Sequence, residues 1–310
     1  MLILKDLSIE IPGTNTHFLK LDEMSSDSEH TALLYGYSNL ENSTLFDKIK
    51  GYKRKVYLNV TMPTEFCSDQ KTFADDKFDE VYTICPYSVK WLNEIKGYNK
   101  YKLTCYPFNE NDRQGKSEKK YDVCYHGGLH SEKHVKMLET FQKFNYRYMS
   151  MTHGINELTS RFINYTTDRN LTNSEKLQRI SESKISVCYN NFPVRNNSDL
   201  NNIKSRPNWR SNEAFKKAET DLVCPQFKSR VNEAAICGTL NLIERDSWNV
   251  IEHFYEPDKH FVYFDRDSLE ERISDILNNW ASYEYMIDAA RLHSRRYSSQ
   301  QLCKNIRSRE

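Results

Sequence analysis

Short runs of β-branched and aromatic residues alternate with longer amphipathic segments along most of this chain. The strand-like runs are TALLYGYSN, RKVYLNVT, FDEVYTICP and YKLTCYPF, followed by YDVCYHGG, NYRYMSM, KISVCYNNF, DLVCPQF, TLNLIER and HFVYF. Between them, apolar residues recur at helical spacing in SVKWLNEIKGY, SEKHVKMLETFQKF, NSEKLQRISESK, RVNEAAICG and DSLEERISDILNNW. This alternation predicts an α/β fold with mainly parallel sheets.

One polar segment divides the chain into two parts. The stretch NENDRQGKSEKK has no apolar side chain, whereas strands and helices are expected on both sides of it. The chain has 310 residues, which exceeds the roughly 100–200 residues of a typical domain. We therefore predict a Rossmann-like domain over residues 1–115, a larger one over 116–285, and a basic helix or helix pair over 286–310.

The composition limits the partners and the compartment of the protein. Lys and Arg number 44 against 43 Asp and Glu, so the net charge is +1 and any anion site must be local. The first residues, MLILKDLSIEIPG, do not read as a signal peptide, and no apolar run approaches the roughly 18 residues of a membrane span. Eight cysteines form no Cys-x-x-Cys motif. These patterns favour a cytoplasmic protein without a zinc ribbon.

The segment from Arg230 to Gly238, RVNEAAICG, carries the strongest chemical signal. Glu233 is expected in the first turn of a helix at the carboxyl edge of a parallel sheet, where its carboxylate can accept hydrogen bonds from paired sugar hydroxyls. Lys228 and Arg230 add positive charge where a helix N-terminus already favours phosphate. A surface helix with a capping charge would show the same local pattern, so the motif by itself leaves both interpretations open.

Two further groups of residues are expected at the carboxyl ends of strands. Gly127 and Gly128 end the run YDVCYHGG, and a glycine pair there lets the backbone approach a phosphate closely or simply makes a tight turn. Asn190, Asn191 and Phe192 follow the run KISVCY and are candidates for contacting the base of a nucleotide. A polar exit from a strand into a loop is the alternative for these three residues.

Three histidines at a spacing of four, His126, His130 and His134, could suggest a metal site. The glycine pair interrupts any helix that would join them, and no carboxylate or cysteine completes the ligand set. We therefore predict no metal site, and we place His130 or Lys133 near a phosphate instead.

From about Tyr121 to its C-terminus, the chain resembles the donor-binding domain of GT-B glycosyltransferases, particularly the branch typified by CgeB-like spore-maturation proteins. The resemblance lies in the order of YDVCYHGG, EKLQRISESKISVCYN and RVNEAAICGTLNLIERDSWNVIEHFYEPDKHFVYFDRDSLEERISDIL. It implies two Rossmann-like domains that face a central cleft, with the C-terminal helix packed back on the first. It also implies that Glu233 binds the ribose hydroxyls, that Arg230 and Lys228 face the diphosphate, and that the Gly127–Gly128 loop borders the phosphates.

The chain departs from this family at one informative position. Many retaining members carry a second glutamate eight positions before the one that matches Glu233, and that glutamate contacts the donor sugar. Here the position is Pro225, and Gln226 and Lys228 replace glycines that are common in the same loop. Sugar recognition and the stereochemical outcome therefore do not carry over from the resemblance.

The first domain would hold the acceptor, and an inverting enzyme needs a general base there to remove the acceptor proton. Glu65, in the segment NVTMPTEFCSD after a predicted strand, is the first candidate, and Asp69 is the second. Solvated loop carboxylates are the alternative for both. Tyr35, Gly36 and Tyr37 are candidates for lining the acceptor cleft.

The resulting prediction is a metal-independent glycosyltransferase without a cofactor, which moves a sugar from a UDP-linked donor to a hydroxyl of a glycan, a protein or a small molecule. A nucleotide-sugar epimerase of the same fold, a nucleic-acid-directed glycosyltransferase and a non-catalytic structural protein remain as alternatives. Nucleic acid is the less expected partner because the basic segment YKRK at 52–55 is short. No Gly-x-Gly-x-x-Gly follows a strand, which argues against a dehydrogenase.

Overall fold

A computed structural model describes the chain in separate stretches, and every structural statement below concerns these stretches alone. They are residues 2–4, 31–35, 51–59, 78–84, 86, 89, 93–94, 99–129, 132–150, 163–193, 223–225, 227–246 and 249–307. The chain forms two compact units. The first comprises Met1–Asn109, Asn196–Leu222 and Tyr297–Glu310, and the second comprises Glu110–Arg195 and Val223–Arg296.

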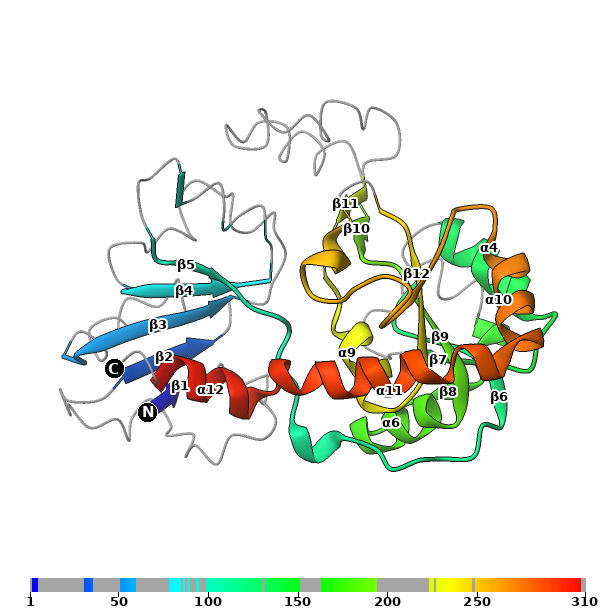
Figure 1. The fold of residues 1–310 in the computed structure, drawn as a ribbon, viewed down its shortest axis with the longest axis horizontal. Helices are drawn as coiled ribbons and strands as arrows, with labels where there is room; N and C mark the ends of the chain where they lie inside the picture. The colour runs from blue at the N-terminus through cyan, green and yellow to red at the C-terminus, as the bar shows by residue number, and fades with distance from the viewer. Residues whose placement is uncertain are drawn as a thin grey trace. The chain divides into compact units, whose positions relative to one another are not determined.

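The first unit is built on a five-stranded parallel sheet in the order β1-β2-β3-β4-β5. Its strands are β1 (Leu2–Leu4), β2 (Thr31–Tyr35), β3 (Arg54–Asn59), β4 (Glu80–Thr83) and β5 (Tyr101–Leu103). Helix α12 (Ser299–Arg307) lies beside this sheet (Figure 1). It is tied there by Arg54, whose guanidinium donates to the Ile306 carbonyl at 2.6 Å, and by the Ser299 amide, which donates to the Phe108 carbonyl at 2.8 Å.

The second unit contains a six-stranded parallel sheet in the order β13-β12-β9-β6-β7-β8. Its strands are β6 (Tyr121–His126), β7 (Tyr146–Ser150), β8 (Asp168–Arg169), β9 (Ser183–Cys188), β12 (Leu240–Glu244) and β13 (Val262–Phe264). The chain runs outward from β6 to β8 on one side and from β9 to β13 on the other. The strand order therefore reverses between β6 and β9, where ligands of open α/β sheets bind.

Helices cover both faces of this second sheet. They are α4 (Glu132–Phe141), α6 (Asn173–Ser181), α9 (Ser229–Ile236), α10 (Leu269–Asn278) and α11 (Glu284–His293), with the short 3-10 helices η3 (Glu110–Asp112), η4 (Ile163–Tyr165), η5 (Val250–His253), η6 (Trp280–Ser282) and η7 (Ser294–Tyr297). Helix α4 contacts α10, and α6 contacts α9. Figure 1 shows the sheet between these two pairs, which is the layering of a doubly wound fold.

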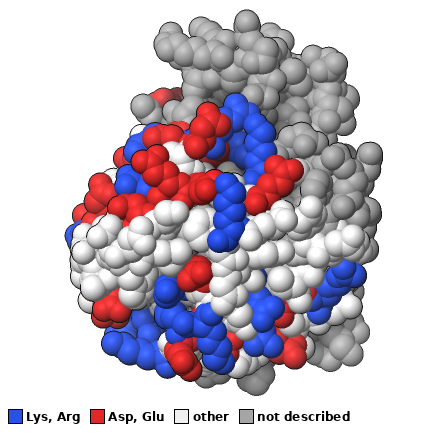
Figure 2. Space-filling view, turned by 90° about the vertical axis from the view of Figure 1, so that its right-hand side faces the viewer, with Lys and Arg blue, Asp and Glu red and all other residues white. Residues whose placement is uncertain are grey.

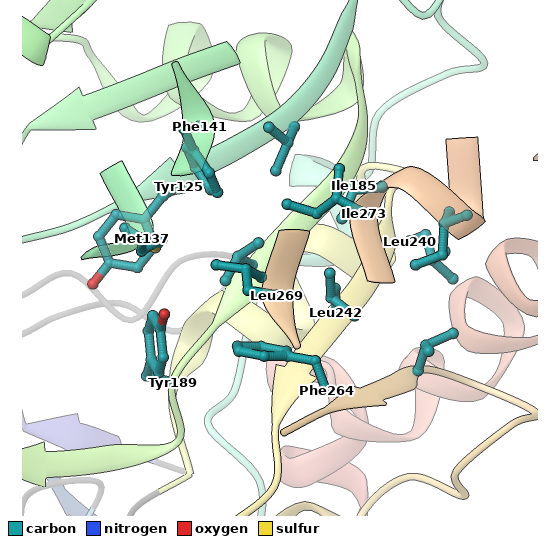
Figure 3. Close-up of a cluster of buried hydrophobic side chains, with 14 of the residues drawn as sticks. Tyr125, Met137, Phe141, Ile185, Tyr189, Leu240, Leu242, Phe264, Leu269 and Ile273 are labelled. Atoms are coloured by element: carbon teal, nitrogen blue, oxygen red, sulfur yellow. The ribbon is translucent and has the colours of Figure 1, made fainter. Parts of the chain in front are cut away.

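The core of the second unit explains why its strands lie where they do. Side chains such as Phe141 on α4, Ile185 on β9, Leu242 on β12 and Ile273 on α10 are fully buried in one cluster, and Figure 3 shows them gathered between the sheet and these helices. Each buried apolar side chain of this size contributes about 1.5–3 kcal/mol. This packing fixes the carboxyl ends of β6, β9 and β12 at one edge of the sheet.

The predicted α/β class with parallel sheets is confirmed, but three local expectations differ. The run DLVCPQF gives β11 (Val223–Pro225), which pairs antiparallel with β10 (Asn191–Pro193) outside the main sheet. Proline cannot donate to a strand ladder, which suits a two-stranded edge ribbon better than a central strand. The strands β1 and β8 were not predicted, because runs of three and two residues give no periodicity to detect.

Two sequence expectations concern membrane spans and surface charge. None of the helices in the described stretches is long and apolar enough to cross a membrane. On the face in Figure 2, basic and acidic side chains are interspersed over the described surface of the molecule. This described face therefore shows no large area of a single charge.

Candidate functional site

A cavity of about 330 Å³ lies at the carboxyl edge of the second unit's sheet. Its walls come from the ends of β6 and β7, the loop after β8, the first turn of α6 and the first two turns of α9. The sequence predicted Glu233 in the first turn of its helix, but α9 begins at Ser229, so Glu233 lies just beyond that turn. The lining residues are His126, Gly127, Met149, Ser150, Asn170, Leu171, Lys176, Ser229, Arg230 and Glu233. The cavity thus sits on the β8-β7-β6 side of the point where strand order reverses.

Helix α9 brings two of the predicted residues into this cavity. Arg230 and Glu233 are three residues apart and therefore share one face of the helix. Ala234 and Ala235, which are buried, let the helix approach the sheet closely. The helix begins after Lys228, whose backbone amide donates to Oδ1 of Asn190 at 3.1 Å, and the Lys228 side chain makes no capping hydrogen bond. The first turn of α9 therefore opens toward the cavity without a side-chain cap.

Two cationic or proton-donating side chains hold the carboxylate of Glu233. Nε2 of His126 lies 2.6 Å from Oε2, and Nζ of Lys176 lies 3.0 Å from Oε1. Burial alone would raise the pKa of Glu233, but Lys176 and His126 more than offset it and hold the pKa well below its usual value. Burial lowers the pKa of His126. Because an ionised carboxylate can only accept hydrogen bonds, Nε2 of His126 is the donor in this pair.

Lys176 reaches Glu233 because the start of α6 is fixed by a capping box. The Thr172 hydroxyl accepts from the Glu175 amide at 3.3 Å, and the Glu175 carboxylate accepts from the Thr172 amide at 2.8 Å. This reciprocal pair satisfies two of the backbone donors that a helix start leaves open. It sets the first turn of α6, so that Lys176 in the next position projects into the cavity.

Gly127 and Arg230 are fitted to each other at the end of β6. Gly127 has φ 125°, a conformation that side chains disfavour, and a Cβ at this position would lie 2.7 Å from Cζ of Arg230. Nε of Arg230 donates to the His126 carbonyl, and its guanidinium carbon lies 5.0 Å from the centre of the Tyr125 ring. Only a residue without a side chain leaves room for the guanidinium here.

The other predicted residues lie in several places. Lys228, Gly128, Lys133 and Asn190 are not among the residues that line the cavity. Nζ of Lys133 pairs with the buried carboxylate of Glu244 at 2.6 Å, and Asn190 is buried behind the start of α9.

Some of the predicted residues have side chains that the structure does not describe. Asn191 and Phe192 belong to β10, of which only the backbone is described, and the same holds for Tyr35 in β2. The candidates Glu65, Asp69, His130, Gly36 and Tyr37 lie outside the described residues.

Sequence reasoning missed the part of the cavity that depends on other strands and on α6. Met149 and Ser150 end β7, Asn170 and Leu171 follow β8, and Lys176 lies on α6. His126 was considered only as a metal ligand, yet its position as the last residue of a strand was a signal for a ligand-facing side chain. Nothing in the local sequence around Lys176 points to Glu233, which is 57 residues away.

The described residues do not bring metal-binding side chains together. No group of three or more His, Cys, Asp or Glu side chains in these stretches could hold a metal ion. His134 packs against the rings of Tyr125 and Tyr189, at centroid distances of 5.6 and 5.0 Å. An Asp-x-Asp sequence, Asp265-Arg-Asp267, does follow β13 directly, and the largely exposed Asp265 lies 3.5 Å from Nε of Arg245.

Comparison with protein families identifies the C-terminal half of the chain. Residues 153–307 match the family described as "Glycosyl transferase-like". This stretch includes most of the second unit's elements from η4 onward, and it contains both Arg230 and Glu233. A comparison with curated proteins gave no match.

Solved structures with similar folds are glycosyltransferases. HepE from Anabaena, in complex with UDP and glucose, has a TM-score of 0.58 and 11% identity, over 89% of this chain and 78% of its own. A mutant of S. aureus TarM, in complex with Fondaparinux, alpha-GlcNAc-glycerol and UDP, has a TM-score of 0.57 and 10% identity, over 92% of this chain and 56% of its own. The pneumococcal O-GlcNAc transferase GtfA, in complex with UDP and GlcNAc, has a TM-score of 0.51 and 9% identity, over 89% of this chain and 56% of its own.

These comparisons confirm the predicted GT-B fold. They also show that the chain spans little more than half the length of TarM, 55% in one structure and 56% in another. At about a tenth of residues identical, the structural likeness establishes the fold alone.

Proposed function

The chain belongs to the glycosyl transferase-like family, and from this premise we propose that it transfers a sugar from a UDP-linked donor to a hydroxyl group of an acceptor. The proposal rests on one observation above all. An ionised, half-buried carboxylate, Glu233, faces a cavity at the edge of the sheet where a GT-B fold takes its donor. Such a carboxylate suits the paired hydroxyls of a ribose.

The choice of a uridine diphosphate is supported by the relatives and by the size of the cavity. The HepE and GtfA structures that share the fold were both solved with UDP. A cavity of about 330 Å³ is at the lower end of the range of pockets that hold small ligands. It suits part of the nucleotide, because the residues proposed for the ribose and for the diphosphate, Glu233 and Arg230, both line it.

Protein groups neutralise the diphosphate in this proposal. Arg230 and the uncapped first turn of α9, which starts with Ser229, supply positive charge and amide donors next to Gly127. The sequence also suggests Lys228, Gly128, His130 and Lys133 as candidates near the phosphates, and this part of the proposal rests on the sequence alone. We propose that transfer needs no divalent ion, because these groups stabilise the departing diphosphate.

The remaining roles concern the base of the nucleotide, the acceptor and its proton. Asn190, with Asn191 and Phe192, would border the donor on the β9 side. Glu65 is the proposed general base of an inverting reaction, and Asp69 is the second choice. The acceptor is a hydroxyl of a glycan, a protein or a small molecule, and we place the reaction in the cytoplasm.

Calorimetric titration with UDP and UDP-sugars tests the proposed site. Glu233→Ala should weaken UDP binding by about 10- to 150-fold, since a hydrogen bond to a charged group contributes roughly 1.5–3 kcal/mol. Glu182→Ala is the matched control, because Glu182 is also a carboxylate with two cationic partners, Lys120 at 2.9 Å and Arg179 at 3.1 Å, but does not line the cavity. Equal affinity of wild type and Glu233→Ala for UDP would refute the assignment of Glu233 to the nucleotide site.

A further inference from the structure

We propose that His126 and Lys176 are positioning residues that fix the Glu233 carboxylate from both sides, so that the cavity selects a ribonucleotide donor over its 2′-deoxy counterpart. This inference rests on the proposed function, since it assigns the ribose to Glu233. It adds two residues on other elements, β6 and α6, that act on the ligand only through that carboxylate.

Each of the two partners contacts a different oxygen of the Glu233 carboxylate. His126 donates to Oε2 at 2.6 Å, and Lys176 donates to Oε1 at 3.0 Å. A carboxylate offers about four lone-pair sites, two on each oxygen. One site on each oxygen therefore stays available, and the spacing of the two oxygens suits two neighbouring hydroxyls. Neither partner needs to leave when a ribose binds.

His126 has no other polar task among the residues that the structure describes. Its side chain is 5% exposed, and its Nδ1 has no hydrogen-bond partner within the described stretches. An unpaired Nδ1 in a buried imidazole costs free energy, and the hydrogen bond from Nε2 to Glu233 is the side-chain contact that offsets this cost. Because Nε2 donates to Oε2 of Glu233, the buried ring fixes the position of that carboxylate oxygen.

Lys176 completes the arrangement from the opposite wall. Its side chain is 17% exposed and lines the cavity, and the capping box of α6 sets its direction. The charged and titratable groups around Glu233 come from several elements: His126 from β6, Lys176 from α6, Arg230 from α9, Asp112 from η3, and the buried thiols of Cys188 and Cys237. Of the hydrogen bonds among these groups, those to the Glu233 carboxylate come from His126 and Lys176, so these two set its orientation.

The test compares binding of UDP and 2′-deoxy-UDP by calorimetry, with full-length wild type and variants. In the wild type, we expect UDP to bind about 10- to 100-fold more tightly, the value of a hydrogen bond from a hydroxyl to a charged acceptor. In His126→Leu and in Lys176→Met this preference should fall below about threefold, because the carboxylate is no longer held for the diol. A loss of general stability would weaken both ligands equally and leave the ratio unchanged.

Conservative variants and matched controls separate the outcomes. His126→Gln, which keeps an N–H donor at a similar reach, and Lys176→Arg should restore the preference for UDP. His134→Leu and Lys184→Met change a buried histidine and an ion-paired lysine that do not line the cavity, and should leave it intact. If His126→Leu does not fold, as judged by circular dichroism, Lys176→Met decides.

Failure of the inference is distinct from failure of the proposed function. If Glu233→Ala abolishes the preference for UDP while His126→Leu and Lys176→Met keep it, the positioning roles are overturned and the ribose site stands. If wild type binds UDP and 2′-deoxy-UDP equally, or binds neither, the assignment of the ribose to Glu233 falls and the inference falls with it.

Discussion

Replacing Gly127 by alanine should separate the backbone role of this glycine from its role in holding Arg230. At φ 125° an L residue is strained, and such strain costs about 1–3 kcal/mol of folding free energy. The new Cβ would lie 2.7 Å from Cζ and 2.8 Å from Nε of Arg230. These atoms belong to a flexible side chain, so the guanidinium moves away and the fold survives with that moderate loss.

The displaced guanidinium should appear as a loss of nucleotide affinity. Arg230 would give up its hydrogen bond to the His126 carbonyl and its place over the Tyr125 ring. If it faces the diphosphate, as proposed, UDP binding should weaken by about 10- to 150-fold, the value of one charge-assisted hydrogen bond. Urea denaturation measures the stability of the variant, and calorimetry measures its affinity for UDP.

Gly238→Ala is a control with the same backbone problem at another place. Gly238 has φ 65°, and the nearest side-chain atom to a Cβ there is Nη1 of Arg291 at 3.7 Å. This variant should lose about 1–2 kcal/mol of stability and keep its affinity for UDP. In an Arg230→Met background, Gly127→Ala should weaken UDP binding little further, because the group it displaces is already absent. Undiminished UDP affinity in Gly127→Ala would refute the fit between glycine and guanidinium.

Two further predictions concern turnover and follow from the proposed charge scheme and acceptor domain. Sugar transfer should survive excess chelator. Loss of activity that manganese or magnesium restores would contradict the proposal that protein groups neutralise the diphosphate. Asp265 and Asp267, which follow β13, would then be the residues to test as metal ligands. In an inverting enzyme, Glu65→Gln should lower turnover by about 10²- to 10⁴-fold with little change in UDP affinity, and an inverted product formed at undiminished rate would exclude Glu65 and make Asp69 the next residue to test.

The sequence predicted the layers of the fold because its strands are long enough to show their pattern. Runs such as KISVCYNNF and TLNLIER became β9 and β12, buried on both faces as central strands of a parallel sheet require. The two-residue β8 carries no such pattern, although its position at the edge shapes one wall of the cavity. Strand order was also beyond local reasoning, since it is decided by which buried faces pack together.

The candidate site divides in the same way. Glu233, Arg230 and Gly127, which all line the cavity, were predicted to lie at one sheet edge because each belongs to a local motif near a helix start or a strand end, whose position in a parallel sheet follows from general rules. Lys176 and His126 were missed because their importance comes from contacts with Glu233 across 57 and 107 residues of chain. Asn190 was placed at the correct strand end, but its amide oxygen accepts from the Lys228 backbone at 3.1 Å, behind the helix start.

The residues around the cavity differ in how strongly the fold constrains them. Gly127 is constrained by its own backbone, because an alanine at φ 125° is strained and meets the guanidinium of Arg230. Residues that reach the carboxylate from other elements, as Lys176 does from α6, can change while the fold stays intact, because a half-buried side chain on a helix surface contributes little to the core. Under the proposed assignment Glu233 contacts the ribose, and substitutions at Lys176 should change the preference for UDP over 2′-deoxy-UDP while the second unit stays folded.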